Sequence, residues 1–183
     1  MIDGKMMLEL IKNRQSDRKY SEKPIEKDKL ERIIEAGRLA PSACNAQPWK
    51  FIIVTEPDLL RKLAEASSAK LLGMNAFVKE APVLLVIVRE NANFTSRIGG
   101  NIKSKDYSLF DIGIAAENIC LQAESEGIGS CILGWFDEMM VKKTLTIPRS
   151  KRVELIITLG YSLNAKREKR RKLKELTVSY NRY

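Results

Sequence analysis

Apolar residues along the chain follow helical spacing in some segments and short continuous runs in others. Repeats at three and four positions predict amphipathic helices, and apolar runs bounded by turn residues predict strands. Helices are expected over 5–14, 28–39, a segment that starts at Thr55-Glu56-Pro57-Asp58, 111–126 and 138–145. Strands are expected over 51–54, 83–88, 130–133 and 153–159. Because the two alternate without an internal repeat or linker, the pattern indicates one layered α+β or α/β domain.

Three segments say more about the expected fold. The strand 83–88 is apolar at every position, which is typical of a central strand covered on both faces. The helix 111–126 is apolar around much of its circumference, so we expect it to be buried or to lie at an interface. Residues 89–107 are polar and contain Gly99-Gly100, which predicts a mobile loop.

The length of 183 residues fits a single domain, 1–183. The longest strongly apolar run has six residues, 83–88, whereas a transmembrane helix needs about 20, so no membrane span is expected. The first residues, MIDGKMMLELIKNR, are too polar for a signal peptide. We therefore expect a cytoplasmic protein.

The chain contains no histidine, which excludes mechanisms based on Ser-His, Cys-His or His-metal groups. Its three cysteines form no CxxC pair, which argues against a disulfide framework, a zinc site or an iron–sulfur cluster. No metal is expected. If the protein is an enzyme, a cofactor must supply its difficult chemistry.

The net charge of +9 is concentrated at the C-terminus, where residues 162–183 carry eight Lys or Arg and two acids. Such a run is compatible with a solvated tail, a nucleic-acid patch or a phosphate site for a small anionic cofactor, and charge alone favours the first two. The tail also holds apolar residues that suggest packing on something, for example a second subunit: Leu173, Leu176, Val178, Tyr180 and Tyr183.

Near the N-terminus, Arg14, Ser16 and Arg18 stand two positions apart. In an extended segment their side chains point to the same side, where forked guanidinium donors suit a phosphate. In a helix Ser16 would face away from Arg14. An anion site therefore requires that the first helix end near Asn13, and the alternative is a solvated helix end.

The loop APSACNAQPW over 40–49 lies between a helix and a strand, where α/β proteins often place ligands. Its small residues would allow close approach to a planar ligand, and Asn45 and Gln47 can donate and accept hydrogen bonds. A tight turn that holds Trp49 in the core is equally compatible with the composition. Cys44 lacks a histidine base, which disfavours thiol catalysis.

The glycines of GIGSCILGWF over 127–136 do not form GxGxxG, and the helix precedes them, so a dinucleotide-binding turn is disfavoured. Taken in order, however, the segments of the chain resemble those of the nitroreductase family of FMN-dependent oxidoreductases. The matching stretches are NRQSDRKY, APSACNAQPWKF, EAPVLLVIV, DIGIAAENICLQAESEGIGSCILGWFDE, and VELIITLGY followed by KREKRRKL.

The resemblance implies a three-layer α-β-α fold of the α+β class, with a central mixed sheet flanked by helices. It also implies a homodimer that binds FMN at the subunit interface, with the basic extension 162–183 packed on the partner subunit.

The resemblance also implies roles for individual residues. Those expected to bind the cofactor are Arg14, Gln15, Ser16 and Arg18 in the N-terminal segment, Pro41, Ser42, Ala43 and Asn45 in the loop from the partner subunit, Asn75 near the flavin pyrimidine, Ile132, Leu133 and Gly134 beside the flavin N5, and Lys169 and Arg171 on the phosphate. Cys44 would face the substrate, and Arg18 would support the reduced flavin electrostatically. No side chain is expected to act as a catalytic base.

The function implied is transfer of reducing equivalents from NADH or NADPH through FMN to a nitroaromatic, quinone or similar small acceptor, in a ping-pong mechanism. A dehalogenase or flavin-cleaving relative is a second possibility, and a basic module that binds flavin or nucleic acid without catalysis is a third. The basic run lacks the interleaved aromatics of single-strand platforms, so the family resemblance favours a small-molecule partner, with no nucleic acid and no membrane.

Overall fold

The computed structural model describes residues 3–68, 74–90 and 105–183. Four strands form one sheet in the order β1-β2-β4-β3. They are β1 (Trp49–Val54), β2 (Val83–Arg89), β3 (Gly129–Leu133) and β4 (Arg152–Gly160). Neighbouring strands pair antiparallel, and a parallel bridge joins Ser16 to Ser130 outside them. All four predicted strands are thus confirmed, each within two residues of its expected bounds.

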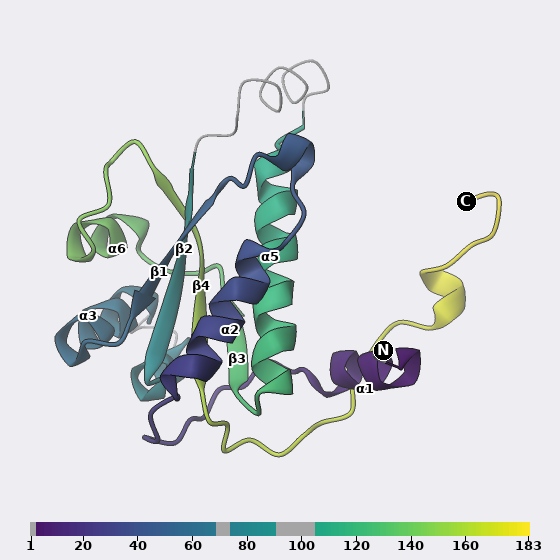
Figure 1. Ribbon diagram of the computed structural model, residues 1–183, viewed down its shortest axis with the longest axis horizontal. Helices are drawn as coiled ribbons and strands as arrows, with labels where there is room; N and C mark the ends of the chain where they lie inside the picture. The colour runs from purple at the N-terminus through teal and green to yellow at the C-terminus, as the bar shows by residue number, and fades with distance from the viewer. Residues whose placement is uncertain (1–2, 69–73, 91–104) are drawn as a thin grey trace.

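Helices cover both faces of this sheet (Figure 1). On one face lie α3 (Pro57–Ser67), α6 (Glu138–Thr144) and the 3-10 turn η2 (Ala76–Glu80). On the other lie α2 (Lys27–Arg38) and α5 (Tyr107–Ser125). Strand β2 faces both layers, since Leu84, Val86 and Val88 belong to the first core and its alternate residues to the second. The expected three-layer α+β architecture and doubly covered central strand are confirmed. The expectation of a mixed sheet is wrong for these four strands, because each runs opposite to its neighbour in the order β1-β2-β4-β3 and, among the described residues, the parallel pairing is limited to the bridge from Ser16 to Ser130.

Local signals explain where the helices begin. Helix α3 starts at Pro57, whose fixed φ suits a first helical position, but Glu56 provides no side-chain cap. Helix α5 starts four residues earlier than predicted because Asp106 accepts a hydrogen bond from the Ser108 amide and caps it. It ends at Ser125, and Gly127 just beyond has a φ of +72°, which suits glycine. Most of the predicted mobile loop, residues 91–104, lies outside the described residues.

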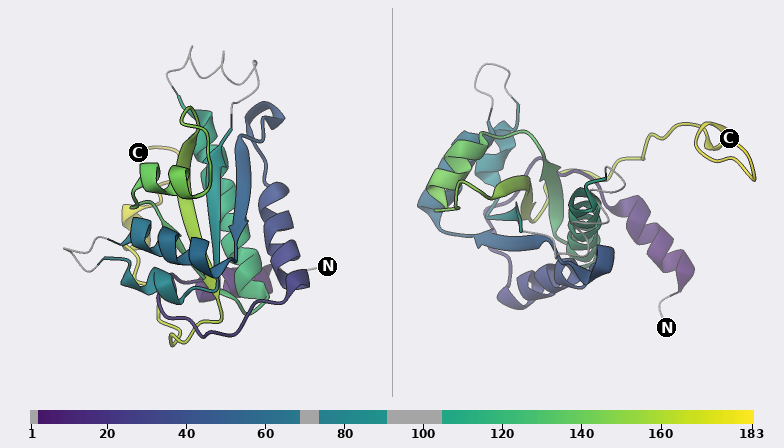
Figure 2. Two further views of the ribbon diagram at one scale, coloured as in Figure 1. Left: turned by 90° about the vertical axis from the view of Figure 1, so that its left-hand side faces the viewer. Right: turned by 90° about the horizontal axis from the view of Figure 1, so that it is seen from above.

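The two ends of the chain project from one side of the body, beyond α5 (Figures 1 and 2). Helix α1 (Gly4–Asn13) has no buried residue. The C-terminal tail contains one short 3-10 turn, η3 (Lys174–Leu176). Its apolar side chains are exposed, with Leu176 at 72% and Tyr180 at 78%. Both ends therefore present apolar surface that this chain does not cover.

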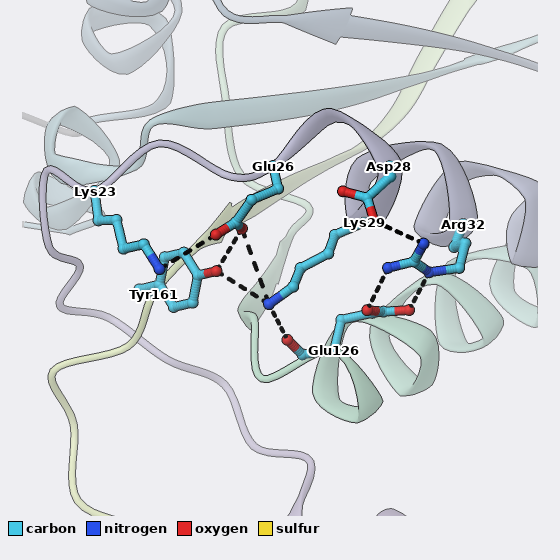
Figure 3. A network of polar contacts seen from close by, with 7 residues as sticks. All are labelled: Lys23, Glu26, Asp28, Lys29, Arg32, Glu126 and Tyr161. Atoms are coloured by element: carbon cyan, nitrogen blue, oxygen red, sulfur yellow. Dashed lines mark hydrogen bonds and ion pairs between the residues drawn. The ribbon is translucent and has the colours of Figure 1, made fainter.

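A network of charged side chains fixes α2 against the end of α5 and the exit of β4 (Figure 3). Arg32 forms a two-pronged bond to Glu126, with Nε–Oε1 at 2.6 Å and Nη2–Oε2 at 2.9 Å. Lys29 donates to the Tyr161 hydroxyl and to the Glu126 carbonyl, each at 3.1 Å. The Tyr161 hydroxyl in turn donates to Glu26 at 2.5 Å. Tyr161 is thereby fixed where the tail begins.

None of the helices in the described part of the chain is long and apolar enough to cross a membrane. Among those same residues, no group of three or more His, Cys, Asp or Glu side chains could hold a metal ion.

Candidate functional site

The N-terminal segment 14–18 is extended, as the anion-site hypothesis required. Helix α1 ends at Asn13, and Arg14 already has extended backbone angles (φ −57°, ψ 123°). Side chains in an extended segment alternate between two sides. Gln15 and Asp17 are buried, whereas Arg14, Ser16 and Arg18 are on the more accessible side. The helix end therefore places two guanidinium groups and a hydroxyl on one side.

The start of the C-terminal tail runs beside this segment and is bonded to it at successive positions. The Leu163 amide donates to the Lys19 carbonyl at 2.9 Å, and the Arg18 amide donates to Asn164 Oδ1 at 2.7 Å. Further along, the Arg167 amide donates to Gln15 Oε1 at 3.1 Å. These bonds connect residues about 150 positions apart, and they bring the basic run of the tail to Arg14 and Arg18.

The two segments enclose a cavity of about 720 Å³. Its lining consists of six cationic side chains, one carboxylate and two polar residues: Arg14, Arg18, Arg167, Lys169, Arg170 and Arg171, with Glu168, Gln15 and Ser16. All four predicted N-terminal residues thus share one cavity with the predicted Lys169 and Arg171. Arg167 and Arg170, which the sequence left without a role, join them.

Electrostatics at this cavity are unbalanced. Burial, and then the nearby charges of Arg14 and Arg171, lower the pKa of Lys169 below its usual value. Arg14 Nε is buried and has no hydrogen-bond partner among the described residues, although Glu117 Oε1 lies 3.5 Å away as an ion-pair partner. A group of crowded cations with an unsatisfied donor is suited to receive an anion.

The free edge of β3 leads away from this cavity. The Ser130 carbonyl accepts from the Asp17 amide at 2.9 Å, so the backbone groups of Ser130 point away from β4. In an antiparallel strand alternate residues share this direction. The edge therefore turns the backbone groups of Ile132 outward, whereas those of Leu133 face β4, and the same alternation continued one residue past the end of β3 would turn those of Gly134 outward. Of the three residues predicted beside the flavin, two can offer an outward amide.

Asn75 lies beside the end of β3. Its side-chain amide donates to the Trp135 carbonyl at 3.3 Å and to the Ser67 carbonyl at 3.1 Å. Its left-handed backbone (φ 60°) is one that asparagine tolerates better than most residues. The structure thus places Asn75 against the segment that follows β3, with its amide nitrogen bonded to the Trp135 and Ser67 carbonyls.

The loop 41–47 has an unusual backbone, since Cys44, Asn45 and Gln47 all have positive φ. It is fixed internally by the Gln47 amide, which donates to Ser42 Oγ at 2.9 Å. Asp111 near the start of α5 accepts from the Ala43 amide at 3.1 Å and holds the loop there. Cys44 is exposed at this loop, with Pro41 and Asn45 exposed nearby.

This loop and the basic cavity lie toward different ends of α5. Asp111 holds the loop, whereas Glu124 binds Lys166 at the start of the basic run. Arg14, which lines the cavity, pairs with Glu117, six positions after Asp111 and about 9 Å along the helix, and the lining of the cavity includes none of the loop residues 41–45. One chain therefore does not bring Pro41, Ser42, Ala43, Cys44 and Asn45 to its own cavity.

The buried thiols near the cavity are poor nucleophiles. Burial raises the pKa of the Cys120 thiol to about 11 and also raises the pKa of Cys131. The nearby charge of Arg18, and then the Ser16 side chain, partly offset the increase in the pKa of Cys131. Burial likewise raises the pKa of Tyr20 far above its usual value. These groups are therefore neutral near pH 7.

Sequence reasoning missed two carboxylates that organise the site, Asp17 and Asp111. Asp17 is fully buried and Asp111 nearly so. The alternation that placed Arg14, Ser16 and Arg18 together also placed Asp17 on the opposite side, so a signal for its burial was present. The partner of Asp111 is 68 residues away in sequence, and no local pattern reveals it.

Comparisons with known proteins agree with this geometry. A family model described as the nitroreductase family matches residues 11–161. A protein of Methanothermobacter thermautotrophicus, provisionally named NADH dehydrogenase/NAD(P)H nitroreductase, is 31% identical over 87% of this chain and 81% of its own. An iodotyrosine deiodinase of Thermotoga neapolitana is 29% identical over 98% and 100%. The solved structure of an FMN-dependent nitroreductase from Clostridium difficile is 29% identical, covers 96% of this chain and 99% of that one, and has a TM-score of 0.78.

Proposed function

Because this chain belongs to the nitroreductase family, we propose that it is an FMN-dependent oxidoreductase. It would take reducing equivalents from NADH or NADPH and pass them to a small acceptor such as a quinone or nitroaromatic, in a ping-pong sequence. The observation that carries the proposal is the cavity of six cations at one end of the β3 edge. The names of the Clostridium and Methanothermobacter proteins support the choice of FMN and of NAD(P)H.

The phosphate of FMN fits the cavity chemically. Arg14 has a buried Nε without a hydrogen-bond partner among the described residues, and the pKa of Lys169 is lowered by burial and then by the nearby cations Arg14 and Arg171. A phosphate dianion would accept a hydrogen bond from Arg14 Nε, and its negative charge would raise the pKa of Lys169 again. In this proposal Arg14, Ser16, Lys169 and Arg171 hold the phosphate. Gln15 supports them from the buried side, because its amide is bonded to Asp17, Ala165 and Arg167.

The ring system of FMN would extend from the phosphate along the edge of β3. At about 3.3 Å per residue, Ser130 and Gly134 lie about 13 Å apart, which suits a ligand with a chain between phosphate and ring. The outward amides of Ile132 and Gly134 would orient the ring, with Leu133 fixing the strand between them. Asn75 would lie near the ring's pyrimidine part, and the Arg18 cation would favour negative charge there.

We place the loop 41–45 in the site of a partner subunit, since α5 holds it away from the cavity of its own chain. Pro41, Ser42, Ala43 and Asn45 would border the partner's cofactor, and Cys44 would face the substrate. The exposed apolar side chains on α1, the first turns of α5 and the tail would be covered in such a homodimer. They are Met6, Leu8, Leu109, Phe110, Leu176 and Tyr180. The 183 residues would then form one domain whose basic extension 162–183 packs on the partner.

When bound, FMN supplies the ability to accept a hydride from a nicotinamide and pass electrons on. The chain itself then needs only to bind FMN, orient its ring system and polarise it. Arg18 supplies charge, the β3 edge supplies oriented donors, and solvent can supply protons, so the absence of histidine is no obstacle.

A second candidate activity is reductive dehalogenation. The deiodinase named above aligns with nearly the whole of this chain, which supports dehalogenation as an alternative reaction at the same site. The two activities differ in the acceptor rather than in the flavin site. A panel that contains a quinone, a nitroaromatic and a halogenated phenol distinguishes them.

The test is to purify the protein, add FMN, remove free flavin, and record the absorption spectrum and the oxidation of NADH and NADPH. We expect a yellow protein that elutes as a dimer and oxidises a reduced nicotinamide when an acceptor is present. A colourless protein without such activity would refute the proposal. Activity only with the halogenated phenol would favour the second candidate.

A further inference from the structure

Below the basic cavity lies a buried carboxyl group, that of Asp17, for which the proposed function gives no role. Asp17 is fully buried. Its Oδ1 accepts from Gln15 Nε2 at 2.9 Å and from Ser162 Oγ at 2.6 Å. One carboxyl oxygen therefore joins a residue of the N-terminal segment to the first part of the tail.

Gln15 extends this connection toward the basic run. Its Nε2 also donates to the Ala165 carbonyl at 3.1 Å, while its Oε1 accepts from the Arg167 amide at 3.1 Å. We call the group of Gln15, Asp17 and Ser162 the Asp17 clasp. Through it the backbone of 165–167 is fixed to segment 14–18, immediately before the residues that carry Lys169 and Arg171.

The clasp is also packed tightly from below. A Cβ added to Gly129, the first residue of β3, would lie 2.7 Å from Asp17 Oδ2 and 2.8 Å from Ser162 Cβ. The carboxyl group therefore lies close against the Gly129 backbone, with Oδ1 carrying the bonds of the clasp and Oδ2 buried without a hydrogen-bond partner among the described residues. A buried and hydrogen-bonded polar group of this kind rigidifies the segments that it joins.

We propose that Asp17 is a positioning residue for the phosphate of the cofactor, an inference that rests on the proposed function. The clasp holds the tail at a fixed separation from segment 14–18, and so sets the distance between Arg14 on one wall and Lys169 and Arg171 on the other. A preorganised pair of walls binds an anion more tightly because less ordering accompanies binding. The clasp contacts the backbone that carries the phosphate residues and has no contact with the far end of the β3 edge.

Because the clasp acts on the phosphate residues and not on the ring site, its variants should weaken binding of FMN but not of riboflavin. General destabilisation would weaken binding of both. FMN and riboflavin share the ring system and differ by the phosphate. Asp17→Ala and Ser162→Ala should each raise the dissociation constant for FMN by about tenfold, the order expected for coupled groups of one network. The dissociation constant for riboflavin should stay within about twofold. The two side chains share one bond, and Ser162 Oγ also accepts from the Asn164 amide at 3.0 Å, so the double variant should lose less FMN binding free energy than the sum of the two single losses.

The experiment titrates apoprotein into each flavin and follows quenching of flavin fluorescence. Ser125→Ala is the matched control, because that hydroxyl bonds only a helix carbonyl, that of Gln122, and should change neither constant. Unchanged FMN binding in the clasp variants, equal losses for FMN and riboflavin, or full additivity in the double variant would each overturn the inference. If Asp17→Ala does not fold, Ser162→Ala, at a half-buried position, still tests the inference through its dissociation constants for FMN and riboflavin.

Hydrogen–deuterium exchange of the apoprotein tests the clasp independently of FMN. Peptides that cover 162–171 should exchange faster in both clasp variants than in Ser125→Ala, and unchanged exchange would overturn the inference. If the wild-type protein binds no FMN, the proposed function fails, and the exchange measurement still decides whether the clasp holds the tail.

Discussion

Two clusters of cations in this protein have opposite electrostatic arrangements. Around Tyr161, three cations meet three carboxylates, and each cation forms at least one ion pair with them: Lys23, Lys29 and Arg32 with Glu26, Asp28 and Glu126 (Figure 3). In the cavity between 14–18 and 167–171, six cations line the walls with Glu168 as the one lining carboxylate. Both clusters join segments far apart in sequence, but only the first is neutral by itself.

The lysines of the two clusters respond accordingly. Hydrogen bonds to Tyr161 raise the pKa of Lys23 and Lys29, whereas burial and neighbouring cations lower the pKa of Lys169. In the cluster around Tyr161 the positive charges are matched by carboxylates of the protein. In the cavity most positive charges lack such a match among the lining residues, so a bound anion could neutralise them. Positive charge alone, which was all that composition offered, does not make this distinction.

The largest effect should come from removing a cation of the cavity. Arg14→Ala and Arg171→Ala should each weaken FMN binding by about 30- to 100-fold, the order of a lost charge-assisted contact. Fluorescence titration gives the constants, and circular dichroism checks that the fold survives. Arg32→Ala removes a cation of the neutral cluster, so it should lower the melting temperature slightly and leave FMN affinity unchanged. Equal loss of FMN affinity in all three variants would contradict the distinction between the cavity and the cluster around Tyr161.

A second test uses two glycines that stand two residues apart. Gly129→Ala would force a Cβ against Asp17 and Ser162, so it should cost about 1–3 kcal/mol of stability and also weaken FMN binding. Gly127→Ala has open space around the new Cβ but a φ of +72°, so it should cost about 1 kcal/mol through backbone strain alone.

Thermal unfolding and FMN titration of both glycine variants separate the two mechanisms. Loss of FMN affinity in Gly127→Ala as large as in Gly129→Ala would mean that destabilisation, rather than the position of the clasp, controls the cavity.

Much of this architecture could be predicted because it depends on local patterns. Periodicity located the strands, and the end of α1 at Asn13 placed Arg14, Ser16 and Arg18 on one side of an extended segment. In the glycine-rich segment after α5, Gly127 takes a positive φ just beyond the helix and Gly129 leaves room for Asp17.

The rest depends on contacts between distant segments, which periodicity does not encode. The alternation along 14–18 indicates which side Asp17 faces, but no local pattern reveals that Ser162, 145 positions away, bonds its carboxyl group there. The direction of the β3 edge is similar, because it took the bridge from Ser16 to Ser130 to establish that Ile132, rather than Leu133, turns its backbone outward.

The contrast between the lysines predicts different behaviour at high pH. Because its pKa is lowered, Lys169 should lose its proton below the usual value of 10.5, and FMN affinity should then fall by about fivefold. Lys23 and Lys29, with raised pKa values, should remain charged through that range. Titrations of FMN at several pH values check this, with Lys169→Met as the control that should lack this step. A step of the same size in Lys169→Met would assign it to another group.

The smallest effect concerns the neutral cluster at low pH. The hydrogen bond from the Tyr161 hydroxyl lowers the pKa of Glu26 from 4.5 to about 2. A carboxyl group with a depressed pKa in the folded state stabilises the protein above its unfolded value, and that contribution is lost as the pH falls through about 2. Tyr161→Phe should therefore move the pKa of Glu26 back toward 4.5, which an NMR titration of its carboxyl carbon measures, and should shift acid unfolding to higher pH. FMN affinity at pH 7 should stay the same, because the cluster that Tyr161 completes has no unbalanced charge to offer a ligand.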